Sequence, residues 1–133
     1  MESHQVSIHI KTDTDIVSAR HEARELAKKL KFSSSELAGI AAAISELARN
    51  IVTYANTGVI RANLIEEKGK KGVKIIAEDT GPGIPDISLA MQNGYSTSNS
   101  LGLGLPGVQR LMDDFEIKSE VGKGTTIIIK KWV

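Results

Sequence analysis

Hydrophobic residues recur with two different periods along this chain, and the period changes where one element gives way to the next. Val6, Ile8 and Ile10 alternate with polar residues, which predicts a strand. Apolar positions then recur every three to four residues, so we expect a helix over residues 16–30, with its N-terminal cap in "TDTD". The residues expected to face the core from this helix are Ala19, Ala23, Leu26, Ala27 and Leu30.

A second helix is predicted from a capping box, in which Ser33 is followed three residues later by Glu36. Its apolar stripe indicates an end near Ala55. Two strands follow, "TGVIRANLIEE" and "GVKIIAED", joined by "KGKKG". We interpret the joining segment as an exposed hairpin turn; a phosphate-binding role for its lysines and glycines is the weaker alternative.

The remaining third of the chain predicts two more helices and two more strands. Asp86 can cap a short helix that ends at Gly94, and Pro106 suits the first turn of a helix that reaches Phe115. "FEIKSEVGKGTTIIIKKW" then reads as two strands about a Gly-Lys-Gly turn. Because the strands come in pairs between helices, we expect an α/β fold of the α+β sandwich type. Its sheet is expected to be mixed but mostly antiparallel, with helices on one face, in a single domain over residues 1–133.

Composition narrows the function classes. The chain has 133 residues, a net charge of +1 and no cysteine, which excludes disulfides and zinc–thiolate sites. The charge balance and the few aromatic residues give no indication of a nucleic-acid partner. Neither a signal pattern nor an apolar run long enough to cross a membrane is present, so we expect a cytoplasmic protein.

Two polar residues border the apolar stripe of the second helix. Glu46 and Asn50 are four residues apart and so lie on the same helix face, beside Ile40, Ile44 and Leu47. One interpretation is an ordinary polar pair on a solvated face. The other is a carboxylate base beside an amide oxygen that can bind a hard cation such as Mg²⁺. The helix alone leaves both open.

Asp79 ends an apolar strand and is followed by glycines in "DTGPG". A carboxylate at the end of a buried strand is costly to desolvate unless it is hydrogen-bonded. Asp79 could accept a hydrogen bond from an exocyclic amine such as that of adenine, while Gly81 and Gly83 let a ligand approach the backbone. A polar turn with no ligand is the alternative, and this motif alone is weak evidence.

A second glycine cluster, "GLGLPG", spans residues 102–107 and matches the dinucleotide-binding pattern as a string. Its context argues against that assignment, because it follows a polar stretch instead of a buried strand. Glycines before a helix N-terminus still suit an anionic phosphate. A glycine-rich loop that merely caps a helix is the other interpretation.

Taken together, "ELARN", "DTGPGIP", "GLGLPG" and "GKGTT" resemble the motifs of the GHKL ATPase superfamily, which groups gyrase, a heat-shock chaperone, a mismatch-repair ATPase and histidine kinases. Within it, the chain is similar to the small bacterial serine kinases of partner-switching systems, which also act as anti-sigma factors. The resemblance implies a Bergerat fold that binds ATP and Mg²⁺. It also implies phosphorylation of a serine or threonine on a STAS-domain partner.

The resemblance also implies roles for individual residues around the base and the metal. Asn50 would bind Mg²⁺, and Asp79 would accept the adenine amine. Gly81 and Gly83 would allow close approach of the base, and Thr125 would support it through Asp79 or a water.

For the phosphates and the transfer step, the resemblance makes Glu46 the general base. Arg49 could contact the γ-phosphate or the partner, or simply be solvated. Residues 96–100 would lie in the lid over the nucleotide. The residues expected to wrap the phosphates are Gly102, Leu103, Gly104 and Gly107.

Three functions are therefore compared. The first is a protein-serine/threonine kinase in a stress-response pathway, acting on a STAS-domain protein and controlling a phosphatase or sigma factor. The second is an ATP-dependent binding module, an anti-sigma factor, whose main role is partner sequestration. The third, a dinucleotide-dependent enzyme, rests on "GLGLPG" alone and is disfavoured by its context.

Overall fold

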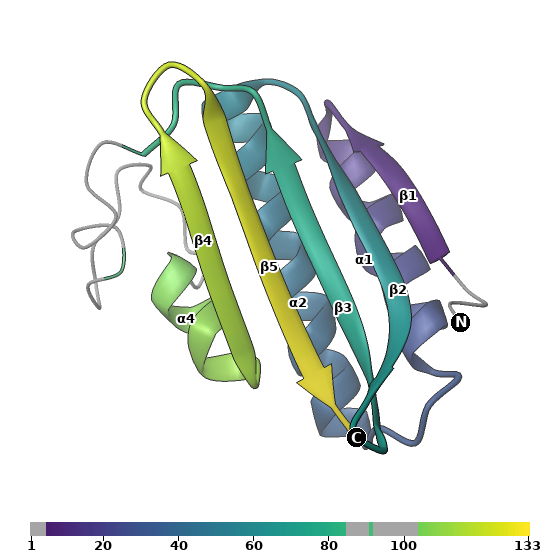
Figure 1. Ribbon diagram of the computed structural model, residues 1–133. Coiled ribbons are helices and arrows are strands. Elements are labelled where there is room, and N and C mark those ends of the chain that lie inside the picture. The colour runs from purple at the N-terminus through teal and green to yellow at the C-terminus, as the bar shows by residue number, and fades with distance from the viewer. Residues whose placement is uncertain (1–4, 85–90, 92–103) are drawn as a thin grey trace.

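The computed structural model describes residues 5–84, 91 and 104–133, and these form a sheet with helices packed against it (Figure 1). The predicted order of elements is confirmed within these residues. The short helix expected over residues 86–94 lies outside the described residues, apart from residue 91. The elements are β1 (Gln5–Ile10), α1 (Asp13–Ala27), α2 (Ser34–Asn50), η1 (Ile51–Ala55), β2 (Gly58–Glu67), β3 (Lys70–Asp79), α4 (Gly104–Leu111), β4 (Asp114–Glu120) and β5 (Gly124–Trp132).

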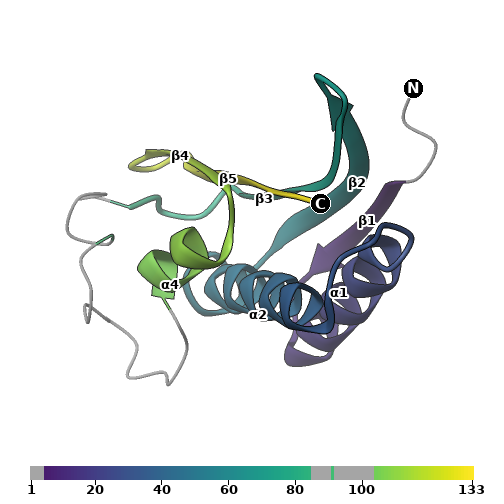
Figure 2. The same cartoon turned by 90° about the horizontal axis from the view of Figure 1, so that it is seen from below.

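The sheet has five strands in the order β1-β2-β3-β5-β4. All four pairings among the described strands are antiparallel, so they include none of the parallel pairs that a mixed sheet would allow. Figure 2 shows α1, α2 and α4 on one face of the sheet, and among the described residues no helix lies on the other. The expected α+β sandwich with helices on one face is therefore confirmed.

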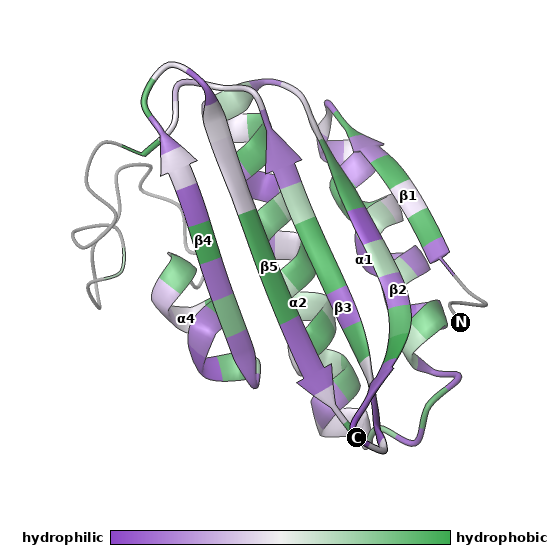
Figure 3. Cartoon of the chain, viewed as in Figure 1, coloured by the Kyte–Doolittle hydropathy of each residue, from purple (hydrophilic) through white to green (hydrophobic). Residues whose placement is uncertain are grey.

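The core lies between the sheet and the helices. Alternation along the strands directs Ile60, Ile75 and Ile129 toward the helices, and they belong to the same buried core as Ile44 and Leu47 of α2. Figure 3 shows the alternating hydrophobic and hydrophilic positions along the strands. Each large aliphatic side chain buried in this way contributes roughly 1.5–3 kcal/mol. In the described part of the chain, no helix is long and apolar enough to cross a membrane.

The first helix starts and ends three residues earlier than predicted, at Asp13 and Ala27. Its start is set by Asp15, whose Oδ2 accepts hydrogen bonds from the backbone N–H groups of Lys11 and Thr12, each at 2.9 Å. Leu30, expected on the helix, lies in the turn after it and is half-buried. Polar capping, rather than the first apolar residue, therefore determines where this helix begins.

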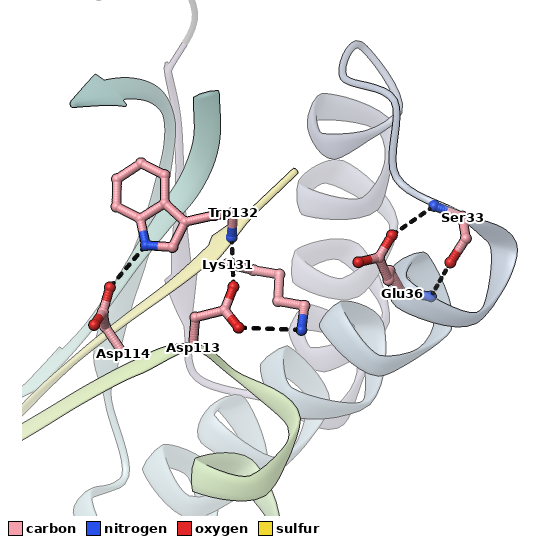
Figure 4. Close-up of polar contacts among 6 residues, drawn as sticks. All are labelled: Ser33, Glu36, Asp113, Asp114, Lys131 and Trp132. Atoms are coloured by element: carbon pink, nitrogen blue, oxygen red, sulfur yellow. Dashed lines mark hydrogen bonds and ion pairs between the residues drawn. The ribbon is translucent and has the colours of Figure 1, made fainter. Parts of the chain in front are cut away.

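The second helix begins as predicted (Figure 4). Ser33 Oγ accepts the Glu36 backbone N–H at 3.0 Å, and Glu36 Oε1 accepts the Ser33 N–H at 2.9 Å. The left of Figure 4 shows the end of the sheet near the end of β5, where Trp132 donates from its backbone and its indole to Asp113 and Asp114, each at 2.8 Å. These contacts fasten the end of β5 that is remote from Asp79.

One turn and the end of one helix differ from the predictions. The β2–β3 turn consists of Lys68 and Gly69 alone, both with positive φ as a two-residue type I′ hairpin requires, and the rest of "KGKKG" is paired strand. The helix containing Pro106 ends at Leu111 and does not reach Phe115, which pairs with Ile129 as part of β4. The alternation of β4 overrides the helical spacing there.

Candidate nucleotide site

One row of residues crosses three strands at the end of the sheet where β3 stops. In the strand register Asp79 pairs with Thr125, and Thr125 pairs with Ser119. All three lie on the face that carries Ala77 and Ile127 two residues along, which is the face covered by the helices. The candidate site therefore contains one carboxylate and two hydroxyl groups on neighbouring strands.

Asp79 is held by backbone donors. Its Oδ1 accepts the N–H of Gly81 at 2.9 Å and the N–H of Thr125 at 3.3 Å. Within the described residues, both hydrogen bonds of this carboxylate use Oδ1 and none uses Oδ2. The two N–H groups thus fix the orientation of the carboxylate through Oδ1, while Oδ2 can accept a hydrogen bond from a ligand.

The loop after Asp79 packs against the protein itself. Gly83 has a φ of +81°, and a Cβ there would lie 2.4 Å from the carbonyl oxygen of Glu120. A Cβ on Gly81 would lie 2.6 Å from that of Ala55 at the end of η1. Pro82 accepts the Gly122 N–H at 2.9 Å. These contacts explain both glycines without a ligand, and their predicted role in admitting the base stays a prediction.

Ser119 is a residue of this site that the sequence interpretation missed. Its Oγ accepts the Ile84 N–H at 2.7 Å and lies 2.8 Å from Thr125 Oγ1 and 3.2 Å from the Gly124 carbonyl oxygen. The alternation of Phe115, Ile117 and Ser119 already puts this hydroxyl on the core-facing side of β4. That pattern was the signal that could have found it.

Glu46 is buried and paired. Only 5% of its side chain is exposed, and its Oε1 lies 3.2 Å from Nη1 of Arg49, whose side chain is 41% exposed. Asn50 is half-buried and ends α2, directly before η1. Arg49 therefore forms an ion pair with the candidate base, a contact that was not among the three interpretations drawn from the sequence.

The π-helix η1 carries the chain from Asn50 toward the strands. It continues α2 as predicted to Ala55, whose side chain meets Gly81. π-Helical turns inside helices occur frequently at functional sites. Through this contact the end of the helix that bears Glu46 and Asn50 adjoins the loop that follows Asp79.

The second glycine cluster is described only in part. Gly104 begins α4 with a φ of +70°, and Gly107 is buried within that helix. Gly102, Leu103 and residues 96–100 lie outside the described residues. α4 leads into β4, whose pairing with β5 is antiparallel, so this segment lacks the parallel βαβ context of a dinucleotide site.

A hollow of about 340 Å³ lies at this end of the sheet. It is lined by His9, Thr57, Gly58, Val59, Glu78, Asp79 and Thr80. His9, Val59 and Glu78 alternate with core residues and so point away from the helices. Asp79 lines this hollow, whereas Thr125 and Ser119, its neighbours in the strand register, do not.

Comparison with known proteins decides the family. Residues 11–131 match the histidine kinase-like ATPase domain. The chain belongs to this family. The GHKL resemblance and the fold class expected from it are thereby confirmed.

Individual relatives agree with this assignment. The chain is 54% identical over 129 residues to the serine/threonine-protein kinase RsbT of Bacillus subtilis, covering 97% of each. It is 33% identical to an anti-sigma F factor of Geobacillus stearothermophilus, over 74% of this chain and 71% of that one. The expected similarity to switch kinases and anti-sigma factors is confirmed, and the chain is a protein-serine/threonine kinase that uses ATP.

Solved structures share the fold. A Mycobacterium tuberculosis protein with RsbU and RsbW domains superposes with a TM-score of 0.63 at 21% identity, over 97% of this chain and 32% of that one. The mycobacterial sensor histidine kinase MprB gives a TM-score of 0.57 at 18% identity, over 97% of this chain and 96% of that one. At such identities the likeness concerns the fold alone.

Proposed function

We propose that this kinase transfers the γ-phosphate of ATP to a serine or threonine of a STAS-domain partner. The pathway would be a bacterial partner-switching pathway of the stress response that controls a phosphatase or sigma factor. The similarity to RsbT over nearly the whole chain supports the kinase part of this proposal. The main support for a nucleotide site is the geometry of Asp79. Two backbone N–H groups donate to its Oδ1, which leaves Oδ2 as an acceptor for a ligand.

In this proposal, Asp79 accepts the adenine amine and Thr125 lies beside it. The phosphates then extend toward the end of α2 and the glycine-rich segment that begins α4. The residues proposed to contact them through the backbone are Gly102, Leu103, Gly104 and Gly107. Because glycines leave their N–H groups accessible, they suit the anionic oxygens of a triphosphate.

Asn50 fits a magnesium ion that is held mainly by the nucleotide. Its amide oxygen is a hard donor, and among the described residues no three His, Cys, Asp or Glu side chains gather closely enough to hold a metal by themselves. Mg²⁺ is commonly bound by one or two protein oxygens together with phosphates and water. When bound, it would neutralise charge on the phosphates; no further protein ligand is needed.

Glu46 is the proposed base. Phosphoryl transfer depends on positioning and charge neutralisation more than on covalent help, so one carboxylate can orient the partner's hydroxyl and accept its proton. Arg49 is paired with Oε1 of Glu46, so in this proposal Arg49 turns aside as the partner's hydroxyl approaches the carboxylate. The partly exposed Arg49 can make this movement, whereas the buried Glu46 cannot.

The test is transfer of label from γ-labelled ATP, with Mg²⁺, to candidate STAS-domain proteins. Wild type is expected to label a serine or threonine, and Glu46→Gln, which keeps the shape of the side chain, should lose at least about 100-fold in rate. The matched control is Glu25→Gln on α1, where the side chain is 48% exposed. Transfer that is unchanged in Glu46→Gln would exclude it as the base.

The similarity to anti-sigma F factors supports a second function, ATP-dependent capture of a partner such as a sigma factor. In that case capture should survive Glu46→Gln and fail in a variant that cannot bind ATP. Pull-down of candidate sigma factors and phosphatases with and without ATP distinguishes the two. Capture that is indifferent to nucleotide would contradict this second function.

A further inference from the structure

Ser119 makes three polar contacts on its single hydroxyl. The Ile84 N–H donates to Oγ at 2.7 Å, the Gly124 carbonyl lies at 3.2 Å and Thr125 Oγ1 lies at 2.8 Å. A serine hydroxyl has one proton to donate and two lone pairs to accept with. These three contacts therefore exhaust its capacity.

The direction of each hydrogen bond follows from this count. An N–H can only donate and a carbonyl oxygen can only accept, so Ser119 accepts from Ile84 and donates its one proton to Gly124. All three contacts are hydrogen bonds at once only if Thr125 donates its own proton to Ser119. Thr125 then donates to Ser119, and Ser119 donates to the Gly124 carbonyl.

This order leaves the Thr125 hydroxyl without a proton for a ligand. Thr125 Oγ1 keeps only lone pairs, and it stands in the row beside Asp79, whose Oδ2 is likewise an acceptor. Two neighbouring acceptors match a group that offers two N–H donors, which is what the 6-amino group of a purine does. A 6-oxo purine offers a lone pair there instead.

We propose that Ser119 is a positioning residue that fixes Thr125 as an acceptor and so makes the site select a 6-amino purine over a 6-oxo purine. The proposal rests on the proposed placement of adenine at Asp79. A site whose buried polar groups are left unpaired by the wrong ligand rejects that ligand strongly. Without Ser119, the Thr125 proton is released and can turn toward a 6-oxo oxygen.

The experiment compares the dissociation constants of ATP and inosine triphosphate, which carries a 6-oxo group and lacks the 2-amino group of guanine. Wild type is expected to prefer ATP by at least about 100-fold. In Ser119→Ala this ratio should shrink about tenfold or more, while Ser119→Thr, which keeps the hydroxyl, should retain it. Ser7→Ala, an exposed serine on β1, is the matched control.

A purely structural role of Ser119 would weaken both nucleotides equally, and an unchanged ratio in Ser119→Ala overturns the proposal. Ser119→Thr and Ser119→Val have similar volumes and differ in the hydroxyl, so they repeat the comparison if the alanine variant does not fold. Equal ratios in these two variants also overturn it. Wild type that binds neither nucleotide would instead reject the proposed site, and that result is distinct from an unchanged ratio.

Discussion

Arg49 Nη1 lies 3.2 Å from Glu46 Oε1, one turn away on α2, so the carboxylate proposed as the base is already engaged by a cation. The two partners differ in exposure, because Glu46 is almost completely buried and Arg49 reaches solvent. Removing Arg49 leaves the buried carboxylate without this partner, whereas removing both charges leaves no charge to compensate.

A double-mutant cycle of Arg49→Met and Glu46→Gln is expected to give a coupling energy of about 0.5–1 kcal/mol. This coupling energy is small because Arg49 is partly exposed and solvent screens its charge. Urea unfolding of the four proteins measures it. The exposed pair of Lys28 and Glu25, at 3.3 Å, is the control and should couple by about 0.2–0.5 kcal/mol. A coupling at Arg49 no larger than at the control pair would contradict the account.

Gly83→Ala is expected to destabilise the protein more than Gly69→Ala, although both glycines have a φ of +81°. A Cβ on Gly83 meets the Glu120 carbonyl, while a Cβ on Gly69 meets nothing within 4 Å. Gly69→Ala should cost about 1 kcal/mol for backbone strain, and Gly83→Ala about 2–3 kcal/mol. Denaturant unfolding measures both, and equal losses would show that the loop does not depend on this contact.

The start of α1 predicts a dependence of stability on pH. Hydrogen bonds from the backbone of Thr12 and then of Lys11 lower the pKa of Asp15 from its usual value. Because the folded pKa lies below the unfolded one, the stabilisation is present at neutral pH and is lost as the pH falls through the folded pKa. An NMR titration should place the pKa of Asp15 below the usual value of an aspartate side chain. Asp15→Asn should remove this part of the acid dependence of unfolding, and an Asp15 pKa at the usual aspartate value would refute the effect.

Local patterns predicted most of the fold. The alternation of Val6, Ile8 and Ile10 and the capping box of Ser33 and Glu36 each lie within a few residues of sequence, and both were confirmed. The limits of α1 and α4 were wrong because hydrogen bonds of Asp15 and strand pairing of Phe115 outweigh apolar spacing. Those interactions are not visible in a helical pattern alone.

The candidate site was predictable in part. The motif residue Asp79 was found, but its link to Ser119 joins positions that are far apart in sequence and meet only through the sheet register. The pairing of Arg49 with Glu46 was within reach, since residues three apart on a helix are neighbours. The proposed roles of Asn50, Gly102 and Leu103 stay predictions.

Calorimetric titration of ATP into Asp79→Asn tests whether Asp79 accepts a hydrogen bond from the adenine amine. The asparagine oxygen can still accept the Gly81 and Thr125 N–H groups, so the fold should persist, while the new NH₂ replaces Oδ2 with a donor facing the amine. Asp13→Asn, at the exposed start of α1, is the control and should bind like wild type. The affinity for ATP is expected to fall at least about 100-fold in Asp79→Asn. Wild-type affinity in a folded Asp79→Asn protein would contradict it.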